Sequence, residues 1–209
     1  MNTCHSPVFR QMLDGVEPRR MWLPAPEQAF ETQRSRLAKA GLARIDAFDH
    51  LAGRLPRIIG PILLVPVMPS QVDWDSVMNL IELDNKKGFS SFKPEQYKNL
   101  EDKIAFPQVP TMLTGVDYGV DCRNVSGVNA FERIRSAGRS PFTTWRNFNL
   151  VFQYPHVLEY LFPVAVASSY RGICVTGIYT VDYSAALVAS PDDVAYSFVG
   201  HSSNVGEER

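Results

Sequence analysis

Residues 162–199 read FPVAVASSYRGICVTGIYTVDYSAALVASPDDVAYSFV, and this stretch decides the fold. It contains four short runs of β-branched and small residues: Val164–Ser168, Cys174–Val181, Ala185–Ala189 and Val194–Val199. Turn residues separate these runs at short intervals, which is typical of antiparallel strands joined by hairpins rather than by crossover helices. The sequence therefore predicts an α+β fold whose C-terminal antiparallel strands pack into one sheet.

The residues from Pro26 onward predict a pair of helices ahead of that sheet. Pro26 suits the first turn of a helix, good helix formers follow to Ala40, and Gly41 stands where a left-handed cap is expected. A second helical stretch, Ala43–Ala52, also ends at a glycine. We therefore expect a helical hairpin.

A central region of mixed strands and helices links the hairpin to the sheet. Its predicted elements are strands at Ile58–Val67 and Thr111–Val116, a helix capped by Asp73 or Asp75, a helix at Val128–Ala137, and a helix capped by Thr143 or Thr144. Residues 1–25 contain prolines without a sustained period and predict an irregular arm, and the polar residues 201–209 predict a frayed tail. Residues 26–200 are expected to form one α+β domain.

The composition argues against several classes of function. A net charge of -1 provides no overall field that would attract nucleic acid or an anionic membrane. The longest apolar run, Ile58–Met68, is too short to span a bilayer and contains two prolines. Residues 1–10 are polar and mixed, without the pattern of an export signal. Three widely spaced cysteines, an odd number, fit a reducing compartment. We expect a cytoplasmic protein that binds neither nucleic acid nor membrane.

A series of short motifs runs from Gly88 to Leu158. In order they are Gly88-Phe89, Asn99-Leu100-Glu101-Asp102, Pro107, Pro110, Asp117-Tyr118-Gly119, Asn124-Val125, Gly138-Arg139-Ser140-Pro141, Thr143, Pro155 and Leu158. This order resembles a bacterial, actinobacterial-type family of unknown function. The C-terminal third departs from that family, which is rich in tryptophan there, whereas this chain has none after Trp145. The resemblance implies an uncharacterised cytoplasmic protein and brings no catalytic residue with it.

The string Gly138-Arg139-Ser140-Pro141 joins two predicted helices and is the most suggestive ligand site. Arg139 beside a serine hydroxyl and a following helix N-terminus can hold a phosphate or a carboxylate, because guanidinium and free backbone N–H groups favour anions. The alternative is structural: Gly138 ends a helix, Pro141 sets a turn, and Arg139 bonds a carbonyl or a carboxylate.

Asp117 and Asp121 flank Gly119 at the end of a predicted strand, and Asn124 follows them. Two carboxylates in such a place suit metal binding or acid–base chemistry. Aspartates beside a glycine are also ordinary turn residues, and no third oxygen ligand falls at a calcium-loop spacing. The turn interpretation is therefore favoured, with Asp117, Asp121 and Asn124 kept as candidate ligand-binding residues.

The histidines predict no metal site, because no two of them have the spacing of paired ligands. A Cys–His dyad assembled from Cys122 or Cys174 with His156 stays open, since its members need not be adjacent in sequence. The chain contains no glycine-rich phosphate loop or dinucleotide fingerprint, and no cofactor is expected.

Two hypotheses of function follow. The first is a noncatalytic binding or scaffolding protein whose partner is a small anion, a peptide or a second copy of the chain in a homodimer. The second is a small hydrolase or transferase that uses Asp117 or Asp121 as base and Arg139 as anion clamp. The second requires these groups to converge in one cleft.

Overall fold

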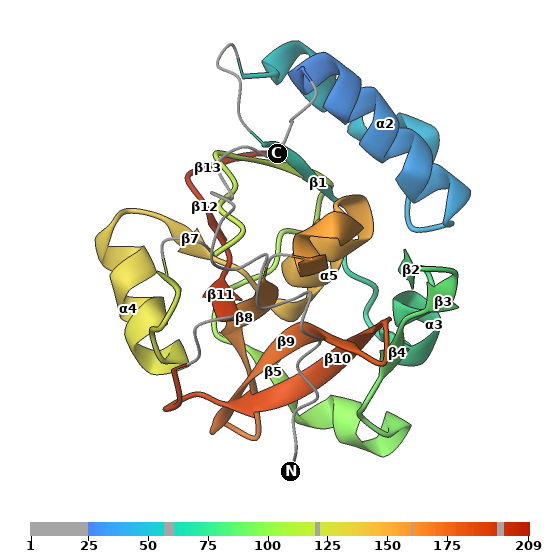
Figure 1. The fold of residues 1–209 in the computed structure, drawn as a ribbon. Coiled ribbons are helices and arrows are strands. Elements are labelled where there is room, and N and C mark those ends of the chain that lie inside the picture. The colour runs from blue at the N-terminus through green and yellow to red at the C-terminus, as the bar shows by residue number, and fades with distance from the viewer. Residues whose placement is uncertain (1–24, 57–60, 120–121, 160, 196–198) are drawn as a thin grey trace.

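The structure, a computed structural model, describes residues 25–56, 61–119, 122–159, 161–195 and 199–209. In these ranges the chain has the predicted α+β fold, with helices around a curled, mostly antiparallel sheet (Figure 1). The predicted N-terminal arm, apart from Ala25, lies outside the described residues.

The main sheet is built on three long strands, β8 (Phe162–Tyr170), β9 (Cys174–Val181) and β10 (Ser184–Pro191), which pair antiparallel in that order. Asp182 and Tyr183 join β9 to β10 with φ of 49° and 65°. Such a two-residue turn matches the twist of the strands that it connects. The antiparallel hairpins predicted from this stretch are confirmed.

Shorter strands extend this sheet to six, with β5 pairing β8 beside the path β11-β8-β9-β10-β4. They are β4 (Phe89–Ser90), parallel to β10, β5 (Leu100–Asp102), antiparallel to β8, and β11 (Val199–His201), parallel to β8. Of the fourth predicted run, Val194–Val199, only Val199 is in a described strand, and residues 196–198 lie outside the described ranges.

The N-terminal helical hairpin is also confirmed, although its second helix is of the 3-10 type. Helix α2 (Pro26–Lys39) begins at the predicted proline, and Gly41 beyond it has φ +71°. The helix buries Phe30, Gln33 and Leu37 against the 3-10 helix η2 (Ile45–Arg54) and strand β1 (Leu63–Val65). A strand is thus present within the predicted range Ile58–Val67, but shorter.

Helix α5 (Thr144–Gln153) forms the centre of the molecule. It packs between β1 on one side and β8 and β9 on the other, and each of its ten residues is buried (Figure 1). Thr143 caps it by accepting a hydrogen bond from the Arg146 N–H, as predicted. The rings of Trp145, Phe148 and Phe152 stack along it and contribute to the core.

The C-terminal residues correct one prediction. Residues 201–209 are not a frayed tail: after β11 they form β12 (Ser203–Asn204), which pairs with β7 (Ser140–Pro141), and β13 (Gly206–Glu208), which pairs with β6 (Thr111–Thr114). Strands β1, β6 and β13 make a second, three-stranded sheet. The segment is polar but ordered because strand pairing bonds its backbone groups, and Arg139 and Arg146 donate to its Ser203 and Glu207 side chains. Hydrogen-bonded polar residues can be buried.

The remaining elements lie around these two sheets. Helix α4 (Gly127–Ser136) packs on β8 and leads to Gly138, whose φ is +70°. The other elements are α3 (Trp74–Met78, capped by Asp73), β2 (Glu82–Leu83), β3 (Lys86–Lys87), η3 (Pro94–Asn99) and η5 (Pro155–Glu159). In the described ranges, no helix combines the length and apolar character needed to cross a membrane.

Candidate functional site

Arg139, the leading sequence candidate, stands between α4 and β7. The left-handed turn at Gly138 reverses the chain there. The Arg139 Nε donates to Ser203 Oγ at 2.8 Å, and its Nη2 donates to the carbonyl oxygens of Gly115 at 2.8 Å and Ser203 at 3.3 Å. The guanidinium therefore ties β12 to the end of β6, as the structural interpretation proposed.

A groove of about 420 Å³ opens beside Arg139. Four arginines and one glutamate line it, an excess of three positive charges. The lining residues are Ile104, Ala105, Arg135, Gly138, Arg139, Ser140, Pro141, Arg146, Val205, Glu207 and Arg209. They come from the chain after β5, the α4–β7 connection, helix α5 and the C-terminal segment. We call this feature the arginine groove.

The carboxylate in the lining, Glu207, is already paired. Its Oε2 accepts from Arg146 Nη2 at 2.7 Å, and its Oε1 accepts from Arg209 Nε at 3.0 Å. Arg146 Nη1 also donates to Ser140 Oγ at 3.2 Å, so the Arg146 guanidinium is occupied on two sides. Glu207 thus offsets part of the local charge without making the groove acidic.

Some arginine nitrogens remain for a ligand. Among the described residues, Arg139 Nη1 has no acceptor, and the Arg135 guanidinium lies 5.9 Å from the centre of the Phe131 ring. Lys103 Nζ lies 5.4 Å from the same ring centre, outside the groove lining. Arginine forms strong, charge-assisted hydrogen bonds to carboxylate and phosphate. The arrangement is suited to an anion.

A carboxyl group adjoins the groove on strand β5. Ser168 Oγ donates to Asp102 Oδ1 and accepts from the Thr144 N–H at 2.7 Å. Desolvation raises the pKa of Asp102, whereas the Ser168 hydrogen bond and the Arg146 charge oppose that rise. Ser168 itself is fully buried, so its hydroxyl joins β8 to α5 and has no access to a substrate.

Neither Asp117 nor Asn124 belongs to the groove lining. The Asp117 backbone pairs with Ser203, and its carboxylate accepts from the Gly119 N–H at 2.9 Å within its own turn. Asn124 is an exposed turn residue with φ +57°. Asp121 lies outside the described residues. Of the five candidates, the structure brings Arg139 and Ser140 together in the groove.

Arg135, Arg146, Glu207 and Arg209 were missed by the sequence analysis. A signal existed for two of them, because Glu207 and Arg209 alternate and would share one face of a strand. That signal was lost because the tail was expected to fray. Arg146 is buried on a helix whose neighbouring side chains, such as Trp145 and Phe148, are core aromatics, and no pattern in the sequence distinguishes it from them.

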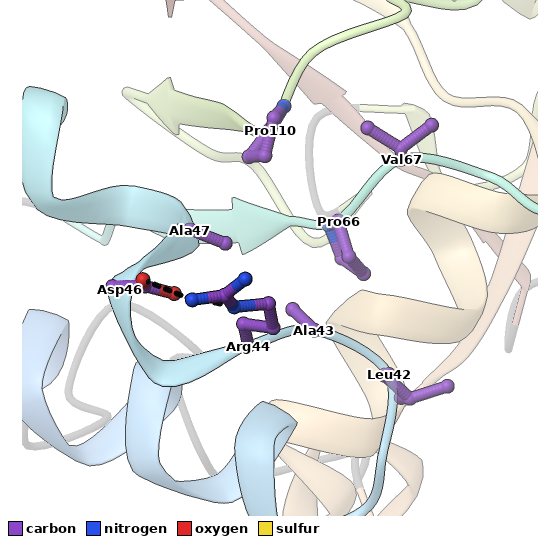
Figure 2. A pocket seen from close by; sticks show the side chains of 8 residues that line it. All are labelled: Leu42, Ala43, Arg44, Asp46, Ala47, Pro66, Val67 and Pro110. Atoms are coloured by element: carbon purple, nitrogen blue, oxygen red, sulfur yellow. Dashed lines mark hydrogen bonds and ion pairs between the residues drawn. The ribbon is translucent and has the colours of Figure 1, made fainter.

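A second hollow, of about 450 Å³, lies between η2 and the ends of β1 and β6. Figure 2 shows its walls of proline, alanine, leucine and valine side chains, with Arg44 and Asp46 pointing toward each other. Their two hydrogen bonds, of 2.7 Å and 3.1 Å, pair the charges of this hollow with each other. It offers an apolar surface and little that would select a ligand.

The described cysteines and histidines form no metal-binding cluster. Within the described ranges, no three His, Cys, Asp or Glu side chains are grouped to hold a metal ion. Cys122 packs in a small apolar cluster with Ala130 and Val164, whereas the ring of His156 lies against Tyr154. His201 is buried, with its Nε2 2.8 Å from the Val125 carbonyl oxygen.

The chain matches a known protein family. A family described as a family of unknown function, DUF5701, matches residues 24–170. This range includes every motif that carried the resemblance, and it ends at the last residue of β8. No curated protein and no solved structure matches the chain.

Proposed function

We propose that this chain, which belongs to the family of unknown function DUF5701, is a noncatalytic protein that binds a small anion in the arginine groove. The observation that supports this is the convergence of four arginines from three parts of the chain on one groove whose lining carboxylate is already paired. Guanidinium groups that protein contacts hold in place bind anions with little loss of conformational entropy.

The hydrolase alternative has less support. It needs a base beside Arg139, but the Asp117 carboxylate accepts a hydrogen bond in its own turn and does not line the groove. Asp102 adjoins the groove but is hydrogen-bonded to the buried Ser168. A cytoplasmic location is part of the proposal, and the odd number of widely spaced cysteines supports a reducing compartment.

Thermal denaturation with inorganic phosphate, at constant ionic strength set with chloride, tests the proposal. Phosphate binding to the native state should raise the melting temperature by several degrees at about a hundred times the Kd. The test variant is Arg135→Ala, because this exposed side chain can be removed without breaking a hydrogen bond of the described residues.

Arg133→Ala is the matched control, since Arg133 is exposed on the same helix but does not line the groove. The phosphate effect should be reduced in Arg135→Ala and kept in Arg133→Ala. Equal stabilisation of the wild type and both variants would show that phosphate acts elsewhere and would overturn the proposal.

A further inference from the structure

We infer that the arginine groove takes a diphosphate, two linked phosphate groups, in preference to a single phosphate or a carboxylate. This inference rests on the proposed function and adds the chemical class of the ligand. Three features of the groove carry it: its charge, the directions of its donors and its size.

The charge of the groove exceeds what one phosphate supplies. Four arginines and one glutamate leave an excess of three positive charges in the lining, and outside it the charges of Lys103 and Asp102 oppose each other. Inorganic phosphate carries between one and two negative charges near neutral pH, because its second pKa lies close to 7, whereas pyrophosphate carries about three. Matching of opposite charges favours the more highly charged ligand.

The donors approach the groove from different elements. Arg135 stands on the last turn of α4, Arg139 follows the turn at Gly138, and Arg209 follows β13. A carboxylate accepts hydrogen bonds in one plane, whereas a phosphate presents oxygens in tetrahedral directions. Donors from separate elements therefore suit phosphate groups better than a planar carboxylate.

The size of the groove fits more than one phosphate. Its volume of about 420 Å³ falls within the range of about 300–1,000 Å³ that is typical of small-molecule sites. Arg139 is fixed by Ser203 and Gly115, so one phosphate would lie at its Nη1. The second phosphate would lie toward Arg135, whose exposed guanidinium lines the groove.

Isothermal titration calorimetry on the full chain, at constant ionic strength, tests the inference with four ligands: pyrophosphate, inorganic phosphate, ADP and citrate. Pyrophosphate should bind about tenfold more tightly than phosphate or citrate, which corresponds to one additional charge-assisted hydrogen bond. Arg135→Ala should weaken pyrophosphate about tenfold and phosphate about threefold, because Arg135 would contact one phosphate group of pyrophosphate directly and would act on a single phosphate at Arg139 through its charge. Arg133→Ala should leave both affinities unchanged.

The ADP titration distinguishes two ligands that carry a diphosphate group, a nucleotide and the inorganic ion. ADP binding as tightly as pyrophosphate would support a diphosphate at the end of a nucleotide. Pyrophosphate binding without ADP binding would support the inorganic ion.

Two results would overturn the inference while leaving anion binding intact. One is equal affinity for phosphate and pyrophosphate, and the other is citrate binding as tightly as pyrophosphate. Binding of none of these ligands would overturn the proposed function together with the inference. The unliganded melting temperature of Arg135→Ala, unchanged from the wild type, confirms that the variant folds.

Discussion

Arg146 on the central helix and Glu207 on the last strand form an ion pair of 2.7 Å, with 3% of the Arg146 side chain exposed and 19% of Glu207. The pair joins α5 to β13 across 61 positions of sequence. The pair also forms part of one wall of the arginine groove, because both residues line it. Stability and the proposed anion binding therefore depend on the same contact.

Glu207→Gln should lower the free energy of unfolding by about 2–4 kcal/mol. The substitution leaves the Arg146 guanidinium buried without its counter-charge, and removal of one partner of a buried pair is strongly destabilising. Urea denaturation followed by circular dichroism measures the change. Glu208→Gln is the control, because Glu208 is 45% exposed and lies 3.7 Å from Arg54, and its loss should cost less than about 1 kcal/mol. Equal effects of the two substitutions would contradict this prediction.

The Gln33 side chain should provide the main hydrogen-bonding contact between the N-terminal helical hairpin and the core. Its Nε2 donates to the Ile62 carbonyl oxygen and to the Tyr154 hydroxyl, and its Oε1 accepts from the Leu64 N–H at 2.8 Å. Gln33→Ala leaves a buried N–H without a partner, which costs about 1–3 kcal/mol. Gln28→Ala, at an exposed position of the same helix, should change stability by less than about 0.5 kcal/mol in the same urea titration.

Local signals explain which parts of the fold were predictable. The observed bounds of β9 equal those predicted from the Cys174–Val181 run. One residue of each predicted pair of cap candidates caps its helix, Asp73 rather than Asp75 and Thr143 rather than Thr144. Each of these features depends on residues close together in sequence.

The groove depends on distant residues instead. Arg139 donates a hydrogen bond to Ser203, which is 64 positions away in the sequence, and no short-range sequence pattern predicts such a partner. The polar C-terminal segment was misjudged for the same reason: its burial depends on strands β6, β7 and β8, which lie far upstream.

Two glycines with positive φ should respond differently to alanine. Gly138, at φ +70°, has nothing within 4 Å of the position that a Cβ would occupy, so Gly138→Ala should cost only the conformational strain, about 1 kcal/mol. At Gly119, at φ +106°, an added Cβ would lie 2.6 Å from the Gly200 Cα, and backbone would have to move. Gly119→Ala should therefore cost more than about 4 kcal/mol or prevent folding, as soluble yield and urea denaturation would show. Similar losses for both variants would contradict the steric explanation.

The imidazole of His201 provides a pH-dependent contribution to stability. Burial lowers its pKa below the ordinary value, although the hydrogen bond to the Val125 carbonyl oxygen opposes this. Because Nε2 donates to that carbonyl in the neutral ring, a further proton must enter at Nδ1, which has no hydrogen-bond partner among the described residues. Protonation would thus place an unpaired charge in the interior.

Acidification should therefore destabilise the protein below about pH 6.5, the ordinary histidine value, because the unfolded chain takes up a proton that the folded chain does not. The pKa of such a histidine is lower in the folded chain than in the unfolded chain. Its contribution to stability is therefore fully present above the unfolded pKa and is lost as the pH falls below that value, by up to about 1.4 kcal/mol per pH unit for each such histidine. Partial burial also lowers the pKa of His156, but this side chain is exposed and the Glu159 charge opposes the shift, so His201 should contribute most of the effect. Urea denaturation at several values between pH 7.5 and 5.5 should show this loss, and His201→Gln should flatten it. The exposed His50→Gln should leave the slope unchanged, and a wild-type protein equally stable across this range would contradict the argument.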